Sequence, residues 1–295
     1  MACPAEICDL IALYSRGEGS SIFPAKQYDS ELNIKVTLER RVAITPTVYI
    51  FVVSYSSDHD EIFKCHTFAH FIFHGTHDQP SQPGHWNGVQ IPIADDCKVT
   101  KKFTPIFLDH GRREVHFLIR IYRRSERYPD GGRFTRFLES LKPQDQLTIS
   151  PSSTKIELLG EGVIRNFKGV IPFKTLNIIA GGTGITPYIR FLIWNQTSKI
   201  NLLFYNKTLE EILLKPLLDS LQRKGLLRIK YIVTSEAPTI ISGYKPDEAA
   251  NVFFGKMCRE DIENFFEKED SCTLFCGPPG MNVRARTLLA ELGFD

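Results

Sequence analysis

Two glycine-rich segments in the C-terminal half of the chain have the composition of ligand-binding turns. They are GGTGITP, residues 181–187, and CGPPGM, residues 276–281. Glycines between a strand and a helix let backbone N–H groups approach a phosphate or a flat ring, and the helix N-terminus adds partial positive charge. GGTGITP lacks the G-x-G-x-x-G spacing of the dinucleotide fingerprint, so a tight turn that only packs a helix on a sheet is the alternative interpretation. Two such turns in one region favour ligand binding.

The elements around these turns alternate between strands and helices. LNIIA (176–180) is a continuous apolar run, which is typical of a strand buried on both faces. Further strands are expected at INLLFY (200–205), LRIKYIVT (227–234) and CTLFC (272–276). Helices are expected from Pro187 with Thr186 as the cap, from a capping box at 208–211 to Arg223, near 259–268, and from Met281 to Leu292. The alternation predicts an α/β doubly wound parallel sheet, in which ligands bind outside the carboxyl ends of the strands.

The N-terminal half shows a different pattern. Short runs rich in β-branched and aromatic residues are separated by Pro, Gly, Asp and Ser, and one helix, Phe134 to Leu141, is expected among them. This pattern predicts a small antiparallel β-barrel or sandwich. The expected strands are LNIKVTLERRV, TVYIFVVSY, FAHFIF, EVHFLIRIY and QLTISP. The expected organisation is an N-terminal tail or linker (1–30), the β-barrel (31–152), a linker (153–174) and the α/β domain (175–295).

Six motifs, in this order and at these separations, resemble the NADH-cytochrome b5 reductase family of the ferredoxin-reductase-like flavoproteins. In the C-terminal half they are IIAGGTGITP, LLFYNKTLEEILLKP and LFCGPPGM. In the N-terminal half, FTPI (103–106) stands where the family has R-x-Y-T-P-[IV]-S, IRIY (119–122) matches K-x-Y, and YPDGGRFT (128–135) matches P-x-G-G-[KR]-[ML]-[ST]. The resemblance runs from about residue 31 to the end and implies an FAD-binding barrel followed by a nicotinamide dinucleotide-binding domain.

The resemblance implies an FAD contact for each N-terminal motif. Phe103 and Thr104 would lie along the isoalloxazine, with the Thr104 hydroxyl near the flavin N5, and Lys101, Pro105 and Ile106 belong to the same motif. Arg120 and Tyr122 would flank the ribityl and phosphate portion. The residues that would cradle the FAD pyrophosphate are Gly131, Gly132, Arg133, Phe134 and Thr135.

The resemblance also implies the nucleotide contacts. Gly181, Gly182, Thr183 and Gly184 would admit the nicotinamide dinucleotide, and Thr186, followed by Pro187, would approach the flavin. Cys276, Gly277, Pro278 and Met281 would close over the nicotinamide. Thr104 and Cys276 are therefore the residues expected next to the transferred hydride, whose donor and acceptor the protein mainly orients. Glu236 would accept a hydrogen bond from the adenosine ribose 2′-OH, so NADH is expected and NADPH is the alternative.

The chain departs from the family pattern at several positions. Lys101 replaces the arginine that opens the flavin motif, Phe103 replaces its tyrosine and Phe107 replaces its serine. Phe68-Ala69-His70 stands in place of the family's G-Q-H strand, and a long insertion, His74 to Lys98, follows it. The final aromatic-ended strand of the family is not found before Phe294-Asp295. An interaction protein on a reductase scaffold that has lost turnover is the non-enzymatic alternative.

Charge is concentrated in one segment of the chain. Residues 98–142 hold twelve Lys or Arg and five Asp or Glu, a net charge of +7 in a chain of net charge +2. A local basic segment indicates a local anionic partner, not nucleic acid. Part of it should meet the FAD phosphates, and Arg123 and Arg124 are assigned to docking an acidic haem protein.

Seven cysteines without a C-x-x-C pair disfavour a disulfide framework and a zinc ribbon, which indicates a reducing compartment. His66, His70 and His74 alternate with Ala69, Phe71 and Phe73, so a polar strand face is expected and no metal site. No stretch of about 18 apolar residues and no secretory signal is found. The expected location is the cytoplasm, or the periphery of a cytosol-facing membrane.

The sequence thus predicts an FAD-containing oxidoreductase that takes a hydride from NADH and delivers single electrons to a haem protein resembling cytochrome b5. The reductase portion of a larger electron-transfer fusion is the enzymatic alternative.

Overall fold

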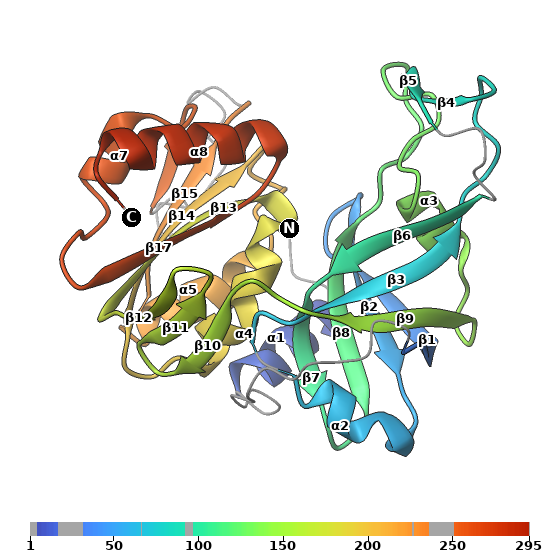
Figure 1. The fold of residues 1–295 in the computed structure, drawn as a ribbon, viewed down its shortest axis with the longest axis horizontal. Coiled ribbons are helices and arrows are strands. Elements are labelled where there is room, and N and C mark those ends of the chain that lie inside the picture. Colours follow the sequence, from blue (N-terminus) through green and yellow to red (C-terminus); the bar gives the residue numbers. More distant parts are fainter. Residues whose placement is uncertain are drawn as a thin grey trace. The chain divides into compact units, whose positions relative to one another are not determined.

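The computed structural model of the protein describes residues 5–16, 32–65, 67–91, 97–225, 227–235 and 251–294. The chain divides into two compact units (Figure 1). The barrel unit comprises the described residues from 32 to 154, and the parallel-sheet unit comprises residues 5–16 together with those from 155 to 294.

The barrel unit is built on one antiparallel sheet of seven strands, in the order β6-β3-β9-β1-β2-β8-β7. The strands are β1 (Ile34–Ala43), β2 (Val48–Ser54), β3 (His70–Thr76), β6 (Lys98–Phe103), β7 (Pro105–Asp109), β8 (Glu114–Arg120) and β9 (Gln146–Ser152). Alternate residues of these strands, such as Val36, Phe71 and Ile149, are fully buried in a shared core. The period-2 pattern of the sequence therefore places one face of each strand inside.

The sheet closes on itself at Thr104. This residue alone separates β6 from β7, although these two strands stand at opposite ends of the strand order. Consecutive Cα atoms are about 3.8 Å apart, so the two edges must lie next to each other. The antiparallel β-barrel expected from the sequence is confirmed.

Short elements connect the barrel strands. η1 (Ser57–His59) and α2 (Asp60–Phe63) precede β3, and α3 (Thr135–Ser140) precedes β9. Inside the predicted insertion, β4 (His85–Trp86) and β5 (Val89–Gln90) form a hairpin. Its turn residues Asn87 and Gly88 have φ values of 49° and 78°, the backbone twist of a type I′ turn.

The main sheet of the parallel-sheet unit has five strands among the described residues, in the order β16-β15-β14-β13-β17, and every pairing in it is parallel. The strands are β13 (Thr175–Gly181), β14 (Lys199–Asn206), β15 (Leu227–Val233), β16 (Val252–Phe254) and β17 (Ser271–Cys276). The helices are η2 (Gly182–Ile185), α4 (Thr186–Trp194), α5 (Lys215–Arg223), α7 (Arg259–Glu263) and α8 (Pro279–Glu291). The predicted doubly wound parallel sheet is confirmed.

Helices cover both faces of this sheet. Ile179, Leu203 and Ile232 pack into one core with the α8 residues Ala285 and Leu288. On the opposite face, the Tyr231 hydroxyl donates to Asp219 Oδ1 of α5 at 2.7 Å. Neighbouring positions along a strand therefore serve opposite layers.

Two helix starts differ from the sequence expectation. Thr186 is the first residue of α4 and does not cap it, because the preceding turn Gly182–Ile185 is already a 3₁₀ helix. α5 begins at Lys215 and not at the capping box of 208–211. The intervening Leu209, Ile212 and Leu213 are buried, so this segment folds inward as turns, and Pro216 opens the helix.

Two segments expected to be linkers are folded. Residues 157–172 form a three-stranded antiparallel sheet of β10 (Glu157–Gly160), β11 (Val163–Asn166) and β12 (Gly169–Pro172). In the N-terminal tail, α1 (Ala5–Ser15) buries Leu10 and Tyr14 and packs against α5. Ile7, Leu10, Ile11 and Tyr14 recur at helical spacing, a signal that the expectation of a tail or linker overlooked.

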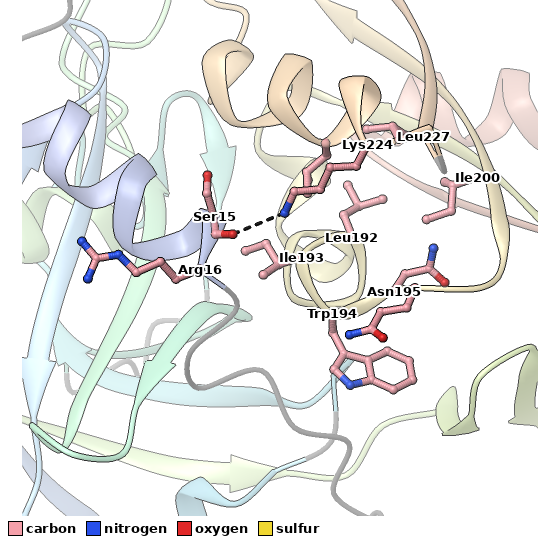
Figure 2. A pocket seen from close by; sticks show the side chains of 11 residues that line it. Ser15, Arg16, Leu192, Ile193, Trp194, Asn195, Ile200, Lys224 and Leu227 are labelled. Carbon is pink, nitrogen blue, oxygen red and sulfur yellow. Dashed lines mark hydrogen bonds between the residues drawn. The ribbon is translucent and has the colours of Figure 1, made fainter.

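The end of α1 borders a cavity of about 500 Å³ in the parallel-sheet unit. Ser15 and Arg16 line it together with Trp194, and Lys224 Nζ donates to the Ser15 carbonyl at 3.3 Å (Figure 2). Ile200 and Leu227, at the starts of β14 and β15, also line it. The cavity therefore lies at the amino ends of these strands, away from the predicted nucleotide-binding edge. Among the described residues, no helix combines the length and apolarity needed to cross a membrane.

Candidate cofactor-binding sites

The two glycine-rich turns of the parallel-sheet unit lie side by side. β13 and β17 are neighbouring strands, and Ala180 pairs with Cys276 at their carboxyl ends. The chain adds β14, β15 and β16 on one side of β13 and returns to place β17 on the other. The turns that follow β13 and β17 therefore flank the topological switch point, where open parallel sheets bind ligands.

One glycine in these turns is required by the packing of one turn on the other. A Cβ at Gly184 would lie 2.1 Å from the Cys276 carbonyl oxygen, which is a backbone atom. Cβ atoms at Gly181 and Gly277 would lie 2.5 Å and 2.2 Å from the Met281 side chain, whose flexible end can shift. Turn packing, the alternative interpretation, thus accounts for Gly184. Gly182 has a φ of 52°, a conformation that side chains disfavour.

Two buried amide oxygens at this edge fit a nucleotide. Among the described residues, Asn206 Oδ1 and Asn282 Oδ1 have no hydrogen-bond donor. Asn206 ends β14 and is 4% exposed, and Asn282 Nδ2 donates to the Gly277 carbonyl at 2.9 Å. The amide of nicotinamide and the hydroxyl groups of ribose are hydrogen-bond donors, so a bound nucleotide would give these two oxygens the donors that they lack. Sequence reasoning missed both residues, although Asn206 opens the NKT sequence inside a quoted motif.

The remaining predicted nucleotide residues are arranged around the same turns. Thr183, Thr186 and Pro187 are partly exposed after β13, and Pro278 is exposed before α8. Burial raises the pKa of the Cys276 thiol and raises that of Cys272 to about 11, so both stay protonated near neutral pH. Cys272 is buried and Cys276 is partly exposed. Glu236 lies outside the described residues.

In the barrel unit, the flavin motif is found where the barrel closes. Phe103 ends β6, with its ring centroid 5.0 Å from that of Phe73 and 5.8 Å from that of Phe134. Thr104 is partly exposed at the junction, Lys101 is exposed, and Pro105 and Ile106 are buried at the start of β7. The junction thus presents a half-buried aromatic ring and a hydroxyl, which fit a flat polar ring system.

The other two FAD motifs meet at the end of β8. Gly132 N donates to the Tyr122 carbonyl at 2.7 Å, and Tyr122 N donates to Thr135 Oγ1 at 3.1 Å. Gly131 has a φ of 69°, and a Cβ there would lie 2.7 Å from the Tyr122 carbonyl oxygen. The loop before α3 therefore folds tightly over the strand end, and glycine allows it. The Tyr122 ring is 56% exposed beside this loop.

Charged side chains near the loop have different partners. Arg120 Nη1 donates to Thr47 Oγ1 at 3.1 Å, and Arg133 Nη2 lies 3.0 Å from His77 Nε2. Phe134 and Thr135 are buried at the start of α3. The loop thus combines a cation with a glycine turn, as a site for the FAD phosphates requires.

Arg123 is bonded within the barrel. Its guanidinium donates to Glu139, to the Pro46 carbonyl at 2.7 Å and to the Tyr49 hydroxyl at 2.7 Å. Its side chain is 43% exposed and shares Glu139 with Arg136, so its assignment to docking stays a prediction. Arg124 is exposed.

The histidines of β3 lie on the outer face of the strand. Phe71 and Phe73 are 1% exposed on the inner face, as the alternation predicts. His74 Nε2 forms a 2.7 Å hydrogen bond with Ser150 Oγ. Burial, followed by the positive charge of Lys102, lowers the pKa of His70 to about 4. Across the described part of the chain, no three metal-ligating side chains gather, and His66 lies outside it.

Comparison with known families identifies both units. Residues 59–158 match the oxidoreductase FAD-binding domain, and residues 178–287 match the oxidoreductase NAD-binding domain. The FAD and NAD assignments of the two halves are thereby confirmed.

Individual relatives agree with this result. Human NADH-cytochrome b5 reductase 1 is 29% identical over 215 residues, which cover 68% of each chain. The nitrate reductase [NADH] of Ulva prolifera is 28% identical over 210 residues, which cover 68% of this chain and 24% of that protein. The chain thus spans about a quarter of this second relative.

A solved structure shows the same fold. The cytochrome b5 reductase domain of U. prolifera nitrate reductase superposes with a TM-score of 0.71 at 22% identity, covering 92% of this chain and 97% of that domain. The chain therefore contains an oxidoreductase FAD-binding domain and an oxidoreductase NAD-binding domain, and it is homologous to the NADH-cytochrome b5 reductases.

Proposed function

We propose that the protein takes a hydride from NADH and delivers the electrons one at a time to an acidic haem protein of the cytochrome b5 type. The observation that carries this proposal is the presence in one chain of a flavin motif at a barrel closure and of two turns at a switch point. Homology to reductases that are named for NADH and cytochrome b5 supports both the donor and the acceptor.

In this proposal, the residues of the chain bind FAD and NADH and orient them. FAD supplies the ability to accept two electrons together and release them singly. Phe103 offers a ring surface and Thr104 a hydroxyl, while Arg133 offers a cation to a phosphate. The turns at Gly181–Ile185 and Cys276–Met281 bind the nucleotide, and Asn206 and Asn282 accept its donors. Cys276 stays a neutral thiol and therefore contributes shape, not charge, beside the nicotinamide.

The basic residues of the barrel unit support an acidic partner. Lys102, Arg124 and Arg127 are exposed. Exposed charges mainly steer encounter and are screened by salt. The double variant Arg124→Glu/Arg127→Glu should reduce the haem protein more slowly, and the salt dependence of this reaction should be reversed. Reduction of a small uncharged acceptor by the same variant should be unchanged.

The match to about a quarter of a nitrate reductase favours a second candidate, the reductase module of a larger electron-transfer protein. In that case the haem acceptor belongs to the same polypeptide. Detection of the protein in cell extracts by an antibody against the barrel unit separates the two. A band far above 33.6 kDa favours the module, and a band near that mass favours the separate reductase.

A reducing compartment suits either candidate. Cys97, Cys258, Cys272 and Cys276 are free thiols. We therefore propose the cytoplasm, or the periphery of a cytosol-facing membrane, as the location.

One spectrum and one assay test the activity. Protein equilibrated with FAD and separated from the excess should show flavin absorbance in the visible region, and NADH should bleach it. Ferricyanide should then be reduced at the expense of NADH. Protein that remains colourless after exposure to FAD would contradict the proposal and favour an interaction protein on a reductase scaffold.

A further inference from the structure

The insertion between β3 and β6 contacts the candidate FAD phosphate loop. We call residues 77–91 the clasp; they include the β4–β5 hairpin (Figure 1). The loop is residues 128–133, which lead into α3. Clasp and loop are about 45 residues apart in the sequence, so their contacts are tertiary.

The clasp fixes the peptide between Gly131 and Gly132. Trp86 Nε1 and Asn87 Nδ2 both donate to the Gly131 carbonyl, at 2.9 Å and 2.8 Å. The N–H of the same peptide, on Gly132, donates to the Tyr122 carbonyl at 2.7 Å. Because both sides of the peptide are bonded, its plane cannot turn without breaking buried hydrogen bonds. Trp86 is 8% exposed, so water does not readily replace its bond.

The clasp also holds a carboxylate. The backbone N–H groups of Ser81 and Asn87 each donate to a different oxygen of Asp130, both at 2.6 Å. The Asn87 side chain returns the contact by accepting from Asp130 N at 2.8 Å. Burial opposes the charge of Asp130, but these backbone hydrogen bonds lower its pKa. The negative charge of Asp130 is therefore held by backbone N–H groups of the clasp.

The third contact involves Arg133 itself. His77 Nδ1 lies 2.6 Å from the Asp78 carbonyl and must carry a proton there. Its Nε2 is then the acceptor for Arg133 Nη2 at 3.0 Å. The His77 ring also packs edge-on against Trp86, with centroids 5.1 Å apart. One end of the clasp thus orients the cation while its hairpin fixes the glycine turn.

We propose that the clasp is a positioning element for FAD, which holds loop 128–133 and Arg133 in the phosphate-binding conformation before the cofactor arrives. A site that is already ordered loses less conformational entropy when the ligand binds. This inference rests on the assignment of Gly131–Thr135 to the FAD phosphates. It adds a role for Trp86, Asn87 and His77, which are positioning residues and touch no reacting atom.

The test compares Trp86→Phe with Val89→Thr in the full-length protein stripped of FAD. Trp86→Phe removes the indole donor and keeps an aromatic ring against His77. Val89 is 69% exposed in the same hairpin, so Val89→Thr is the matched control. FAD affinity is measured by quenching of flavin fluorescence. Loss of one hydrogen bond should raise the Kd for FAD about fivefold in Trp86→Phe and leave it unchanged in Val89→Thr.

Hydrogen exchange separates positioning from a merely structural role. We expect faster amide exchange across 128–133 of FAD-free Trp86→Phe, with the β1 and β2 amides unchanged. Faster exchange throughout the barrel with an unchanged Kd for FAD would overturn the proposal. If Trp86→Phe does not fold, His77→Phe serves as the second variant, with the same expected rise in Kd.

Arg133→Ala distinguishes the clasp from the site assignment. It should weaken FAD binding by about tenfold to a hundredfold, since it removes a charge-assisted hydrogen bond. If Arg133→Ala weakens FAD binding and neither clasp variant does, the clasp proposal is wrong and the FAD assignment holds. If Arg133→Ala leaves the Kd unchanged, the assignment itself is wrong, and the clasp proposal is overturned with it.

Discussion

The two units bring their candidate residues together in different ways. In the parallel-sheet unit, the strand order alone makes the turns after β13 and β17 neighbours, and glycines allow them to touch. In the barrel unit, Phe103 and Thr104 lie where the barrel closes, between β6 and β7, which are the first and last strands of the sheet order. Its candidate phosphate loop is also hydrogen-bonded to the clasp, which comes from a different part of the chain.

Topology thus fixes one candidate site, and long-range contacts fix the other. A parallel sheet defines its binding edge as soon as its strands are ordered. The barrel loop depends on hydrogen bonds that form only when the insertion folds over it. Variants should therefore disable the candidate nucleotide site when they disturb backbone packing, and the candidate phosphate loop when they remove side-chain donors.

The largest effect is expected from Gly184→Val. Its Cβ would lie 2.1 Å from the Cys276 carbonyl oxygen, so the two turns must separate. A misplacement of about 1 Å can lower a rate about a hundredfold, and we expect at least that loss in NADH-dependent ferricyanide reduction. FAD content should stay near that of the parent protein. Gly160→Ala, in β10 of the same unit and outside both turns, is the control, because nothing lies within 4 Å of its Cβ. Normal NADH turnover in Gly184→Val would show that the turns do not form the nucleotide site.

A loss of stability confined to one unit is expected from Tyr14→Ala. Tyr14 is fully buried in α1, and removal of a buried aromatic side chain typically lowers the free energy of unfolding by about 3 kcal/mol. Hydrogen exchange should speed up in β13 and β14 and stay unchanged in β1 and β2. Asp9→Ala, at an exposed position of the same helix, should change neither the free energy of unfolding nor the hydrogen exchange of β13 and β14. Faster exchange in the barrel strands would contradict the assignment of α1 to the parallel-sheet unit.

Acid should destabilise the barrel unit before the parallel-sheet unit. All eight histidines of the chain lie between His59 and His116, within the barrel unit. The pKa of His70 falls from 6.5 to about 4 on folding, so the unfolded state binds more protons in this range. The contribution of neutral His70 to the free energy of unfolding is fully present above about pH 6.5 and is lost as the pH falls towards 4. His70→Gln should flatten the pH dependence of barrel exchange between pH 6.5 and 4.5, and equal acid sensitivity of both units would contradict this account.

The smallest effect is expected from Asn282→Ala. The variant removes one acceptor that has no protein donor among the described residues, at the edge beside Gly277. If the nucleotide supplies the donor, the KM for NADH should rise about two- to tenfold with little change in kcat. Arg286→Ala, at an exposed position of the same helix, is the control. An unchanged KM would remove Asn282 from the site.

Much of the parallel-sheet unit could be predicted from the sequence, because its signals are local. LNIIA was recognised as a buried strand without any knowledge of its partners, and it forms the centre of β13. The start of α5 could not be predicted, because the turn sequence at 208–211 competes with the burial of Leu213 and Leu214, which tertiary packing decides. Asn206 and Asn282 became candidates only through their buried oxygens.

The barrel unit was less predictable for the same reason. Strand alternation revealed its core, but nothing local to Trp86 indicates a bond to Gly131. One signal was present. Asn87-Gly88 between short apolar runs is a strong hairpin sequence and could have revealed β4 and β5. The ties of Arg123 to Glu139, Pro46 and Tyr49 join distant segments and had no signal in the sequence.

In the proposed function, the protein converts the two-electron donor NADH into a source of single electrons for a haem protein. The most direct measurement is an anaerobic titration of FAD-loaded protein with NADH in the presence of excess oxidised cytochrome b5, followed in the haem absorbance bands. The account predicts two haem molecules reduced for each NADH consumed, and no reduction with FAD-free protein. Consumption of NADH without haem reduction would contradict the proposed acceptor, and no consumption of NADH by FAD-loaded protein would contradict the reductase itself.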